Sequence, residues 1–181
     1  NINAKSSKQL LSIATSNASP NSPALKQINT NIEMAKQKIK QVQLFGKSFV
    51  EIELIGDTFD DAYAKAVEDA KENNKIFIHP FDDLKVIAGQ ATVGLEILES
   101  FHSPIDYVFV PIGGGGLAAG LSTVFEELSP NTKIIGVEPE GAPTMKTAIA
   151  TGKNTPLETI DKFVDGAAVK QVGNLTFEIC Q

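Results

Sequence analysis

The stretch VFVPIGGGGLAAG, residues 108–120, places four consecutive glycines directly after a hydrophobic segment and directly before a segment typical of a helix. Glycine loses more conformational freedom on folding than any other residue, so four together require a physical reason. In open α/β folds, the chain between a parallel strand and the next helix lies at the carboxyl edge of the sheet, where ligands bind. Glycines there let backbone N–H groups turn toward an anion, and the helix dipole favours its negative charge. We therefore predict a phosphate cradle, formed by Gly113, Gly114, Gly115, Gly116 and Leu117.

Three other interpretations of the glycines compete with this one. A tight turn needs one or two glycines with positive φ rather than four. A Walker A loop is excluded because no Gly-Lys-Ser/Thr follows. A dinucleotide fingerprint, G-x-G-x-x-A, is satisfied by Gly113, Gly115 and Ala118. Glu138 follows Ala118 by 20 residues, where a ribose-binding acid would lie, so the spacing by itself leaves NAD open as the ligand.

The composition indicates a soluble α/β protein of one domain or two small ones. The chain has 181 residues, of which 42% are hydrophobic and 14 are glycine, and this length is enough to bury a core. No apolar stretch is long enough to span a bilayer, and the start shows no signal-peptide pattern. The single cysteine, Cys180, excludes an internal disulfide and agrees with a reducing compartment. We therefore expect a cytoplasmic protein without a membrane partner.

The net charge of −6 conceals an asymmetry along the chain. Residues 1–47 carry seven lysines and one acid, whereas the remainder carries nine lysines and 21 acids. The basic segment has no aromatic residue before Phe45, and the whole chain has no arginine. Because nucleic-acid binding favours arginine and stacking aromatic side chains, this pattern argues against a nucleic-acid partner.

Hydrophobic periodicity predicts strands that alternate with helices. We expect helices at residues 31–45, 56–74, 84–100, 117–128 and 142–152, and strands at residues 49–55, 76–79, 106–112 and 133–138. This alternation implies a parallel sheet with right-handed crossovers. The expected fold class is therefore α/β, with parallel sheets and flanking helices.

Local signals refine these elements. The first two helices should each bury one apolar stripe, made of Ile32, Ala35, Ile39, Val42 and Phe45, and of Phe59, Ala62, Ala66, Val67 and Ala70. We expect Asp57 to cap the second helix and the pair Asp82–Asp83 to cap the third. Gly46 should end the first helix and Gly152 the last. The tail should form a turn at Asp165–Gly166 followed by a short apolar segment.

Six segments together carry a resemblance to a known family. In chain order they are KQKIKQVQLFG, GDTFDDAYAKA, IFIHPFDDLKVIAGQATVGLEIL, PIGGGGLAAG, KIIGVEPEGAPTMKTAI and DKFVDGAAVKQVGNLTFEICQ. This succession resembles the threonine dehydratases (threonine ammonia-lyases), which belong to the fold type II, or tryptophan-synthase-β-like, pyridoxal-phosphate enzymes. The resemblance runs from about Lys36 to Gln181, roughly four-fifths of the chain.

The resemblance implies a cofactor, a reaction and an assembly. Gly113 to Leu117 would bind the phosphate of pyridoxal 5'-phosphate, and Gly166 and Ala167 would lie near its ring. Glu138 would be structural, which overrides the NAD interpretation. The implied reaction is β-elimination of water from threonine or serine, giving a 2-oxo acid and ammonia, with the cofactor as electron sink and a Schiff-base lysine as anchor. Isoleucine biosynthesis and a homo-oligomer belong to the same expectation.

Parts of the family pattern are missing. The Schiff-base lysine and a Ser-x-Gly-Asn-His motif should precede Lys36, where the chain reads TSNASPNSPALK, and a Ser-Gly-Gly-Asn stretch should follow Gln181. None of the 16 lysines has the family's lysine context, so we nominate no catalytic residue. We therefore expect a central fragment that is inactive alone.

The family resemblance and the composition together predict how the chain is divided into domains. It is a weakly ordered leader unlike the family at 1–30, part of the small domain at 31–100 and part of the large cofactor-binding domain at 101–181. Two alternatives stay open, namely a non-catalytic phosphate- or dinucleotide-binding module and a nonfunctional truncated remnant.

The remaining reactive side chains are interpreted as structural. His79 precedes Pro80 without a nucleophile motif, so it is expected to pack or hydrogen-bond within its loop, and His102 is expected at the surface. Lys146 and Lys162 are expected to be solvated. Two distant histidines and one cysteine support no metal site.

Overall fold

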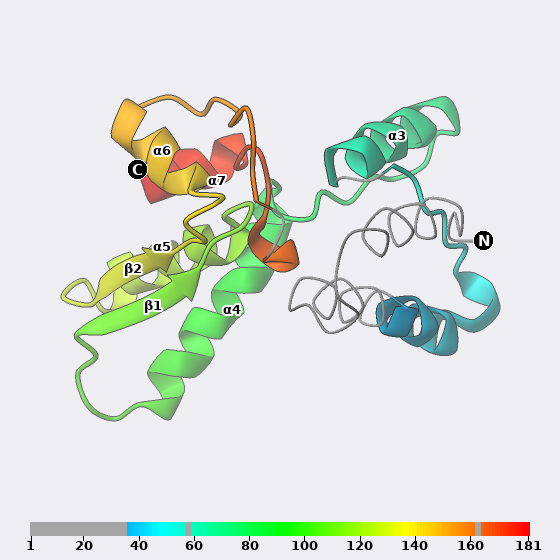
Figure 1. The fold of residues 1–181 in the computed structure, drawn as a ribbon. Coiled ribbons are helices and arrows are strands. Elements are labelled where there is room, and N and C mark those ends of the chain that lie inside the picture. The colour runs from blue at the N-terminus through cyan, green and yellow to red at the C-terminus, as the bar shows by residue number, and fades with distance from the viewer. Residues whose placement is uncertain (1–35, 57–58, 162–163) are drawn as a thin grey trace, which may run out of the picture. The chain divides into compact units, whose positions relative to one another are not determined.

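The computed structural model describes residues 36–56, 59–161 and 164–181 (Figure 1). The chain divides into two compact units, one up to residue 56 and one from residue 57 onward, and each is described by itself. The leader expected at 1–30 lies outside the described residues. The domain division expected near residue 100 concerns the whole fold of the relatives and stays a prediction.

The first unit contains a helix over the described residues 36–46, followed by the 3-10 helix η1 (Lys47–Phe49). The expected helix is therefore present. Its expected apolar stripe is not buried within the described residues, because Val42 is 47% exposed and Phe45 is 81% exposed. The stripe members Ile32 and Ala35 lie outside the described part of the chain.

Residues 49–55, which were expected to form a strand, do not form one. Phe49 ends η1, and residues 50–55 have no regular secondary structure. A strand needs a neighbour to pair its backbone N–H and C=O groups, and the described residues provide none here. The alternation of apolar residues is also not matched by burial, since Leu54 is 53% exposed.

The second unit contains the α/β arrangement that positions the glycine loop (Figure 1). Its elements in chain order are α3 (Phe59–Glu72), α4 (Leu84–Ser100), β1 (Tyr107–Pro111), α5 (Gly116–Leu128), β2 (Lys133–Val137), α6 (Thr144–Thr151), the 3-10 helix η2 (Asp165–Ala167) and α7 (Asn174–Cys180). The four helices and two strands expected in these regions are confirmed, whereas α7 replaces what was expected as an apolar tail.

The sheet consists of two parallel strands in the described residues. β1 and β2 pair from Tyr107 opposite Lys133 to Pro111 opposite Val137, and α5 connects them. This is the strand–helix–strand unit of an α/β fold. A backbone hydrogen bond from Ile112 N to Val137 O, at 2.9 Å, extends the pairing to the residue before the glycines. The expected parallel sheet is therefore confirmed, and its carboxyl edge leads into the glycine loop.

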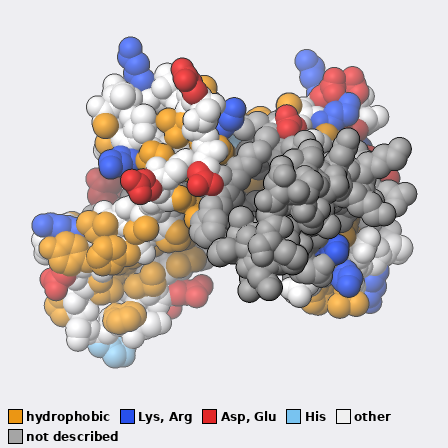
Figure 2. Space-filling model, in the orientation of Figure 1, with side chains coloured by type: hydrophobic (Ala, Val, Ile, Leu, Met, Phe, Trp, Pro, Cys, Tyr) orange, Lys and Arg blue, Asp and Glu red, His pale blue; other side chains and the backbone are white. Residues whose placement is uncertain are grey.

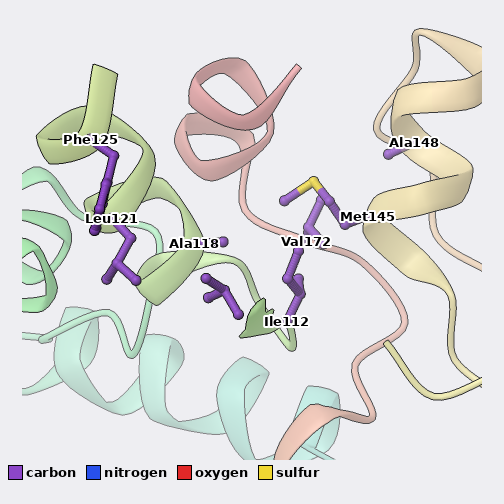
Figure 3. Close-up of a cluster of buried hydrophobic side chains, with 8 residues drawn as sticks. Ile112, Ala118, Leu121, Phe125, Met145, Ala148 and Val172 are labelled. Carbon is purple, nitrogen blue, oxygen red and sulfur yellow. The ribbon is translucent and has the colours of Figure 1, made fainter. Parts of the chain in front are cut away.

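The core of this unit lies between β1, α5, α6 and the tail (Figure 3). Its buried members are Val110, Ile112, Ala118, Leu121, Phe125, Met145, Ala148 and Val172. Three of them lie at helical spacing on one face of α5, and Phe125 among these is only 1% exposed. Because burying a side chain of this size stabilises the fold by about 1.5–3 kcal/mol, this face anchors α5 and hence the loop that precedes it.

Two glycines bring α4 and α5 close together. A Cβ on Gly120 would lie 2.7 Å from Ala91 N and 2.8 Å from Ile87 O, and a Cβ on Gly94 would lie 3.1 Å from the Val124 side chain. Any larger residue at these positions would push the helices apart. Close packing therefore explains why glycine occurs inside both helices despite its low helix propensity.

Hydrophobic side chains also lie at the surface over the two-stranded sheet (Figure 2). The exposed hydrophobic residues of the strands are Tyr107, Phe109, Ile135 and Val137, and Phe109 is the most exposed of these, at 69%. The described residues thus bury only part of the apolar surface of the sheet.

Residues 76–79, expected as a short strand, form none. No strand pairs with them among the described residues, and Ile76 and Ile78 are 93% and 75% exposed. The β-branched composition favours a strand only where a neighbouring strand supplies hydrogen bonds and a packing surface. The prediction of a strand was therefore wrong, because no neighbouring strand among the described residues pairs with residues 76–79.

The apolar stripe expected on α3 is not buried by the described residues. Val67 is 38% exposed, Ala62 and Ala66 are exposed, and Ala70 is half-buried. The expected cap, Asp57, and the Phe59 side chain fall outside the described part of the chain.

Candidate functional site

The glycine loop, Gly113 to Leu117, leaves the carboxyl end of β1 and enters α5. α5 begins at Gly116, and Gly115 occupies its N-cap position. The sequence predicted this place for the loop, and the structure confirms it. Open α/β sheets bind ligands at this edge.

Gly115 is required by two independent features. Its φ is +97° and its ψ is −4°, a left-handed conformation that side chains with a Cβ rarely adopt. A Cβ at this position would also lie 2.8 Å from Thr176 Cβ and Oγ1 and 2.9 Å from Met145 Cε. Both the backbone conformation and the packing therefore favour glycine over every other residue at this position.

Two carbonyl groups of the loop accept hydrogen bonds, whereas its N–H groups donate none within the described residues. Gly114 O accepts a hydrogen bond from Thr176 Oγ1 at 2.7 Å and one from Gly173 N at 3.1 Å. Gly115 O accepts one from Ala119 N at 2.9 Å. Among the hydrogen bonds of the described residues, none has an N–H of residues 113–117 as its donor.

These unpaired N–H groups fit an anionic ligand. Gly115 and Gly116 are buried, and a buried N–H without a partner costs free energy unless a ligand or a water accepts from it. The loop also lies at the N-terminus of α5, where the helix dipole is positive. Phosphate, with several acceptor oxygens and a negative charge, matches this donor set.

The segment Gly166–Ala167 lies beside the loop. A Cβ on Gly113 would meet Gly166 O at 3.0 Å and Ala167 Cα at 3.2 Å, so the two backbones approach closely only because residue 113 is glycine. The structure therefore brings together two segments that the sequence assigned to one cofactor. That assignment itself stays a prediction.

Phe81 also packs against the loop, a contact that sequence reasoning missed. Its ring lies where a Cβ on Gly114 would be, and its Cα and Cβ would lie 3.2 Å from a Cβ on Gly116. Phe81 belongs to the HPFDD segment, which no local pattern connects to the glycines. The only signal for this contact was the apolar side chain in an otherwise polar loop.

His79 has the structural role that was expected. Its Nδ1 accepts hydrogen bonds from Asp82 N at 2.8 Å and from Phe81 N at 3.3 Å. Its ring contacts those of Tyr63, Phe77 and Phe81 edge to face, with centroids 4.8–6.0 Å apart. Because Nδ1 accepts, the proton of the neutral ring is on Nε2. The histidine thus fixes the turn that presents Phe81 and Asp82.

The prediction that Asp82 and Asp83 both cap the next helix is right for Asp83 alone. Asp83 is the N-cap of α4, and its Oδ1 accepts from Lys85 N and Val86 N. Asp82 turns the other way, and its carboxylate accepts from three backbone N–H groups at the start of α7, more than 90 residues later in the chain. Adjacent carboxylates therefore cap two different helices.

Glu138 is structural, as the family resemblance implied. Its two carboxylate oxygens accept hydrogen bonds from Met145 N at 2.7 Å and Lys146 N at 2.8 Å, which both lie in the first turn of α6. A carboxylate at a helix N-terminus is stabilised by the helix dipole. Because both oxygens are engaged, Glu138 is not presented as a free acid for a ribose.

His102 and Lys146 are exposed as expected, and Lys162 lies outside the described residues. Burial raises the pKa of the Cys180 thiol to about 11. The described residues contain no group of three or more His, Cys, Asp or Glu that could hold a metal ion. None of the described helices is both long and apolar enough to cross a membrane.

Two hollows lie near the site but not on it. One, of about 170 Å³, is lined by Tyr63, His79, Phe81, Asp82 and residues 171–174. The other, of about 440 Å³, is lined by side chains of α5, β2 and α6 and by Cys180. Neither of these two hollows is lined by residues 113–117.

Comparison with known proteins gives a consistent result. A family model described as pyridoxal-phosphate dependent enzyme matches residues 27–181. The L-threonine dehydratase biosynthetic IlvA of Halalkalibacterium halodurans is 55% identical over 146 residues, which cover 81% of this chain and 35% of that protein. The protein of the same name from Bacillus subtilis is 49% identical over 142 residues, which cover 78% of this chain and 34% of that protein. The chain thus spans about a third of the length of these curated relatives.

Solved structures of similar proteins agree with the family match. The processed form of threonine deaminase isoform 2 from Solanum lycopersicum matches with a TM-score of 0.74 and 44% identity, over 80% of this chain and 41% of that one. Maize serine racemase matches with a TM-score of 0.71 and 29% identity, over 79% of this chain and 43% of that one.

Proposed function

This chain belongs to the family of pyridoxal-phosphate-dependent enzymes, and on that premise we propose that Gly113 to Leu117 bind the phosphate of pyridoxal 5'-phosphate. The observation that supports this most strongly is the run of unpaired N–H groups, two of them on buried glycines, at the N-terminus of α5. A phosphate would accept hydrogen bonds from these groups and would be stabilised by the helix dipole.

Each part of the loop has a separate task in this proposal. Gly115 supplies the left-handed turn that starts α5, and the engaged carbonyl of Gly114 leaves the following N–H available. Gly113 leaves room for the backbone of Gly166 and Ala167, which we propose as neighbours of the cofactor ring. When bound, the cofactor would act as an electron sink for bonds at the α-carbon of an amino acid.

We further propose that the whole protein of which this sequence is a part eliminates water from threonine or serine and yields a 2-oxo acid and ammonia. The support is the 49–55% identity to proteins named biosynthetic threonine dehydratase. A cytoplasmic location and a homo-oligomer are part of this proposal. We assign no catalytic residue within the described chain, and we propose that residues 1–181 alone bind the phosphate but do not turn over substrate.

Amide chemical shifts test the phosphate site directly. The chain labelled with [¹⁵N]glycine would be titrated with pyridoxine 5'-phosphate, which has no aldehyde to react with surface lysines, and separately with pyridoxine. Only the phosphate ester should shift the amide protons of Gly113 to Gly116 downfield, because only it offers acceptor oxygens to the loop. Gly152, at the far end of α6, serves as an internal control and should not move. Equal shifts with both compounds, or none with either, would reject the assignment.

A further inference from the structure

The orientation of one peptide in the glycine loop is set from the tail of the chain. Both hydrogen bonds to Gly114 O come from there, one from Thr176 Oγ1 at 2.7 Å and one from Gly173 N at 3.1 Å. No peptide bond of the described residues is cis, and in a trans peptide the C=O and the following N–H point in opposite directions. Holding Gly114 O toward the tail therefore aims Gly115 N–H away from it.

The two donors that hold this carbonyl are themselves immobilised by packing. Thr176 is 0% exposed, and its hydroxyl also lies 3.1 Å from Gly173 O. A Cβ on Gly173 would overlap the Asp82 carboxylate, so this backbone and that side chain are in direct contact. The donors cannot move without disturbing the start of α7.

Asp82 fixes the start of α7. Its Oδ2 accepts from Asn174 N at 3.0 Å, and its Oδ1 accepts from Leu175 N at 2.9 Å and from Thr176 N at 3.3 Å. Gly173, the N-cap residue, has no side chain with which to cap the helix itself. A helix of seven residues is unstable in isolation, so α7 depends on contacts of this kind for its place.

We propose that Asp82 is a positioning residue for the phosphate cradle. It acts through Thr176 and Gly173 on Gly114 O, and so sets the direction of Gly115 N–H, without touching the phosphate. This inference rests on the proposed function of the loop. The positioning role and simple electrostatics predict opposite effects of removing the Asp82 carboxylate on anion binding. Removing a carboxylate near an anion site should by itself strengthen anion binding, whereas loss of the positioning contact weakens it.

Asp82→Ala is compared with Asp83→Ala. Asp83 is adjacent, carries the same charge and makes the same kind of cap, with hydrogen bonds of 2.8 Å and 3.2 Å, but its helix is α4. The first readout is the amide resonance of Gly115 in the ligand-free chain. The second is the affinity for pyridoxine 5'-phosphate, measured by calorimetry. Asp82→Ala should shift the resonance and weaken binding roughly tenfold, the effect of one well-oriented hydrogen bond to a charged group. Asp83→Ala should leave the resonance unchanged and the affinity within about twofold of the wild type.

A second pair of variants covers the case in which Asp82→Ala does not fold. Thr176→Ser keeps the hydroxyl that donates to Gly114 O and should preserve the Gly115 resonance, whereas Thr176→Val removes it and should shift the resonance.

The outcomes separate the two proposals. An unchanged Gly115 resonance in both Asp82→Ala and Thr176→Val, or tighter binding by Asp82→Ala, overturns the positioning role. If the wild-type chain binds no pyridoxine 5'-phosphate while these variants still shift Gly115, the phosphate assignment fails and the link from Asp82 to the loop stands.

Discussion

Gly115→Ala should destabilise the second unit for two reasons that can be measured separately. The backbone at this position has φ +97°, and a left-handed conformation costs a residue with a Cβ about 1–2 kcal/mol. The new Cβ would lie 2.8 Å from the buried Thr176 and 2.9 Å from Met145 Cε, an overpacking that costs about 1–3 kcal/mol. We therefore expect a loss of about 2–5 kcal/mol in the free energy of unfolding.

Gly152→Ala is the matched control. Gly152 has a φ of +64° at the C-cap of α6, and a Cβ there would meet nothing within 4 Å, so only the backbone cost of about 1–2 kcal/mol applies. Urea unfolding followed by circular dichroism gives both values. The difference between the two variants isolates the packing of the loop against α7 and α6. If Gly115→Ala cost no more than Gly152→Ala, the close packing around the loop would be disproved.

Substitutions at positions 115 and 152 also test whether the loop binds a phosphate. A side chain on residue 115 would point at Thr176 and Met145, so Gly115→Asp would force the loop out of the conformation that presents its N–H groups to an anion. We expect it to abolish binding of pyridoxine 5'-phosphate, whereas Gly152→Asp should retain binding. Undiminished binding by Gly115→Asp in calorimetry would count decisively against a phosphate cradle.

Three further predictions concern packing, pH and activity. Gly120→Ala should lower the free energy of unfolding, measured in urea, by about 1–3 kcal/mol, because its Cβ would lie 2.7 Å from Ala91 N. Gly89→Ala on α4 should raise the free energy of unfolding by about 0.5–1 kcal/mol, because the new Cβ would have open space around it. Equal effects of the two substitutions would refute the close packing of α4 against α5. The Cys180 thiol has a pKa of about 11 against an ordinary 9.0, so the unfolded chain loses this proton first and the free energy of unfolding should fall as the pH rises from 9.0 to about 11, a decrease that Cys180→Ser should lessen. The chain given threonine and saturating pyridoxal phosphate should form no 2-oxobutanoate beyond that formed by the free cofactor, and turnover that disappears on replacing one of its 16 lysines would contradict this.

Local signals in the sequence predicted the structure correctly where both partners of an interaction lie within a few residues of each other. The helix expected at 84–100 is α4, Leu84–Ser100, since its apolar period and its cap, Asp83, lie in one short segment. The end of α6 at Gly152 follows from one residue with positive φ. The parallel β1–α5–β2 unit was likewise predictable, because its strand, four glycines, helix and second strand follow one another directly along the chain.

The same reasoning failed where a pattern needed a partner from elsewhere. Residues 49–55 and 76–79 alternate or cluster apolar residues as strands do, but no strand pairs with either among the described residues. β propensity describes how well a side chain fits a pleated, half-buried surface. Without that surface, the propensity does not decide the structure.

By itself the sequence determined that this chain has a glycine loop between a strand and a helix, and its resemblance placed Gly166 and Ala167 with the same cofactor. Only the tertiary structure decided what packs against the loop, namely the Phe81 ring at Gly114 and the Thr176 side chain at Gly115. Asp82 and Asp83 show the reason. Two identical neighbouring side chains cap different helices, and the partner of Asp82 lies 92 residues away. Such a contact has no period or spacing in the sequence, because it forms only when packing of the whole unit has already brought the two segments together.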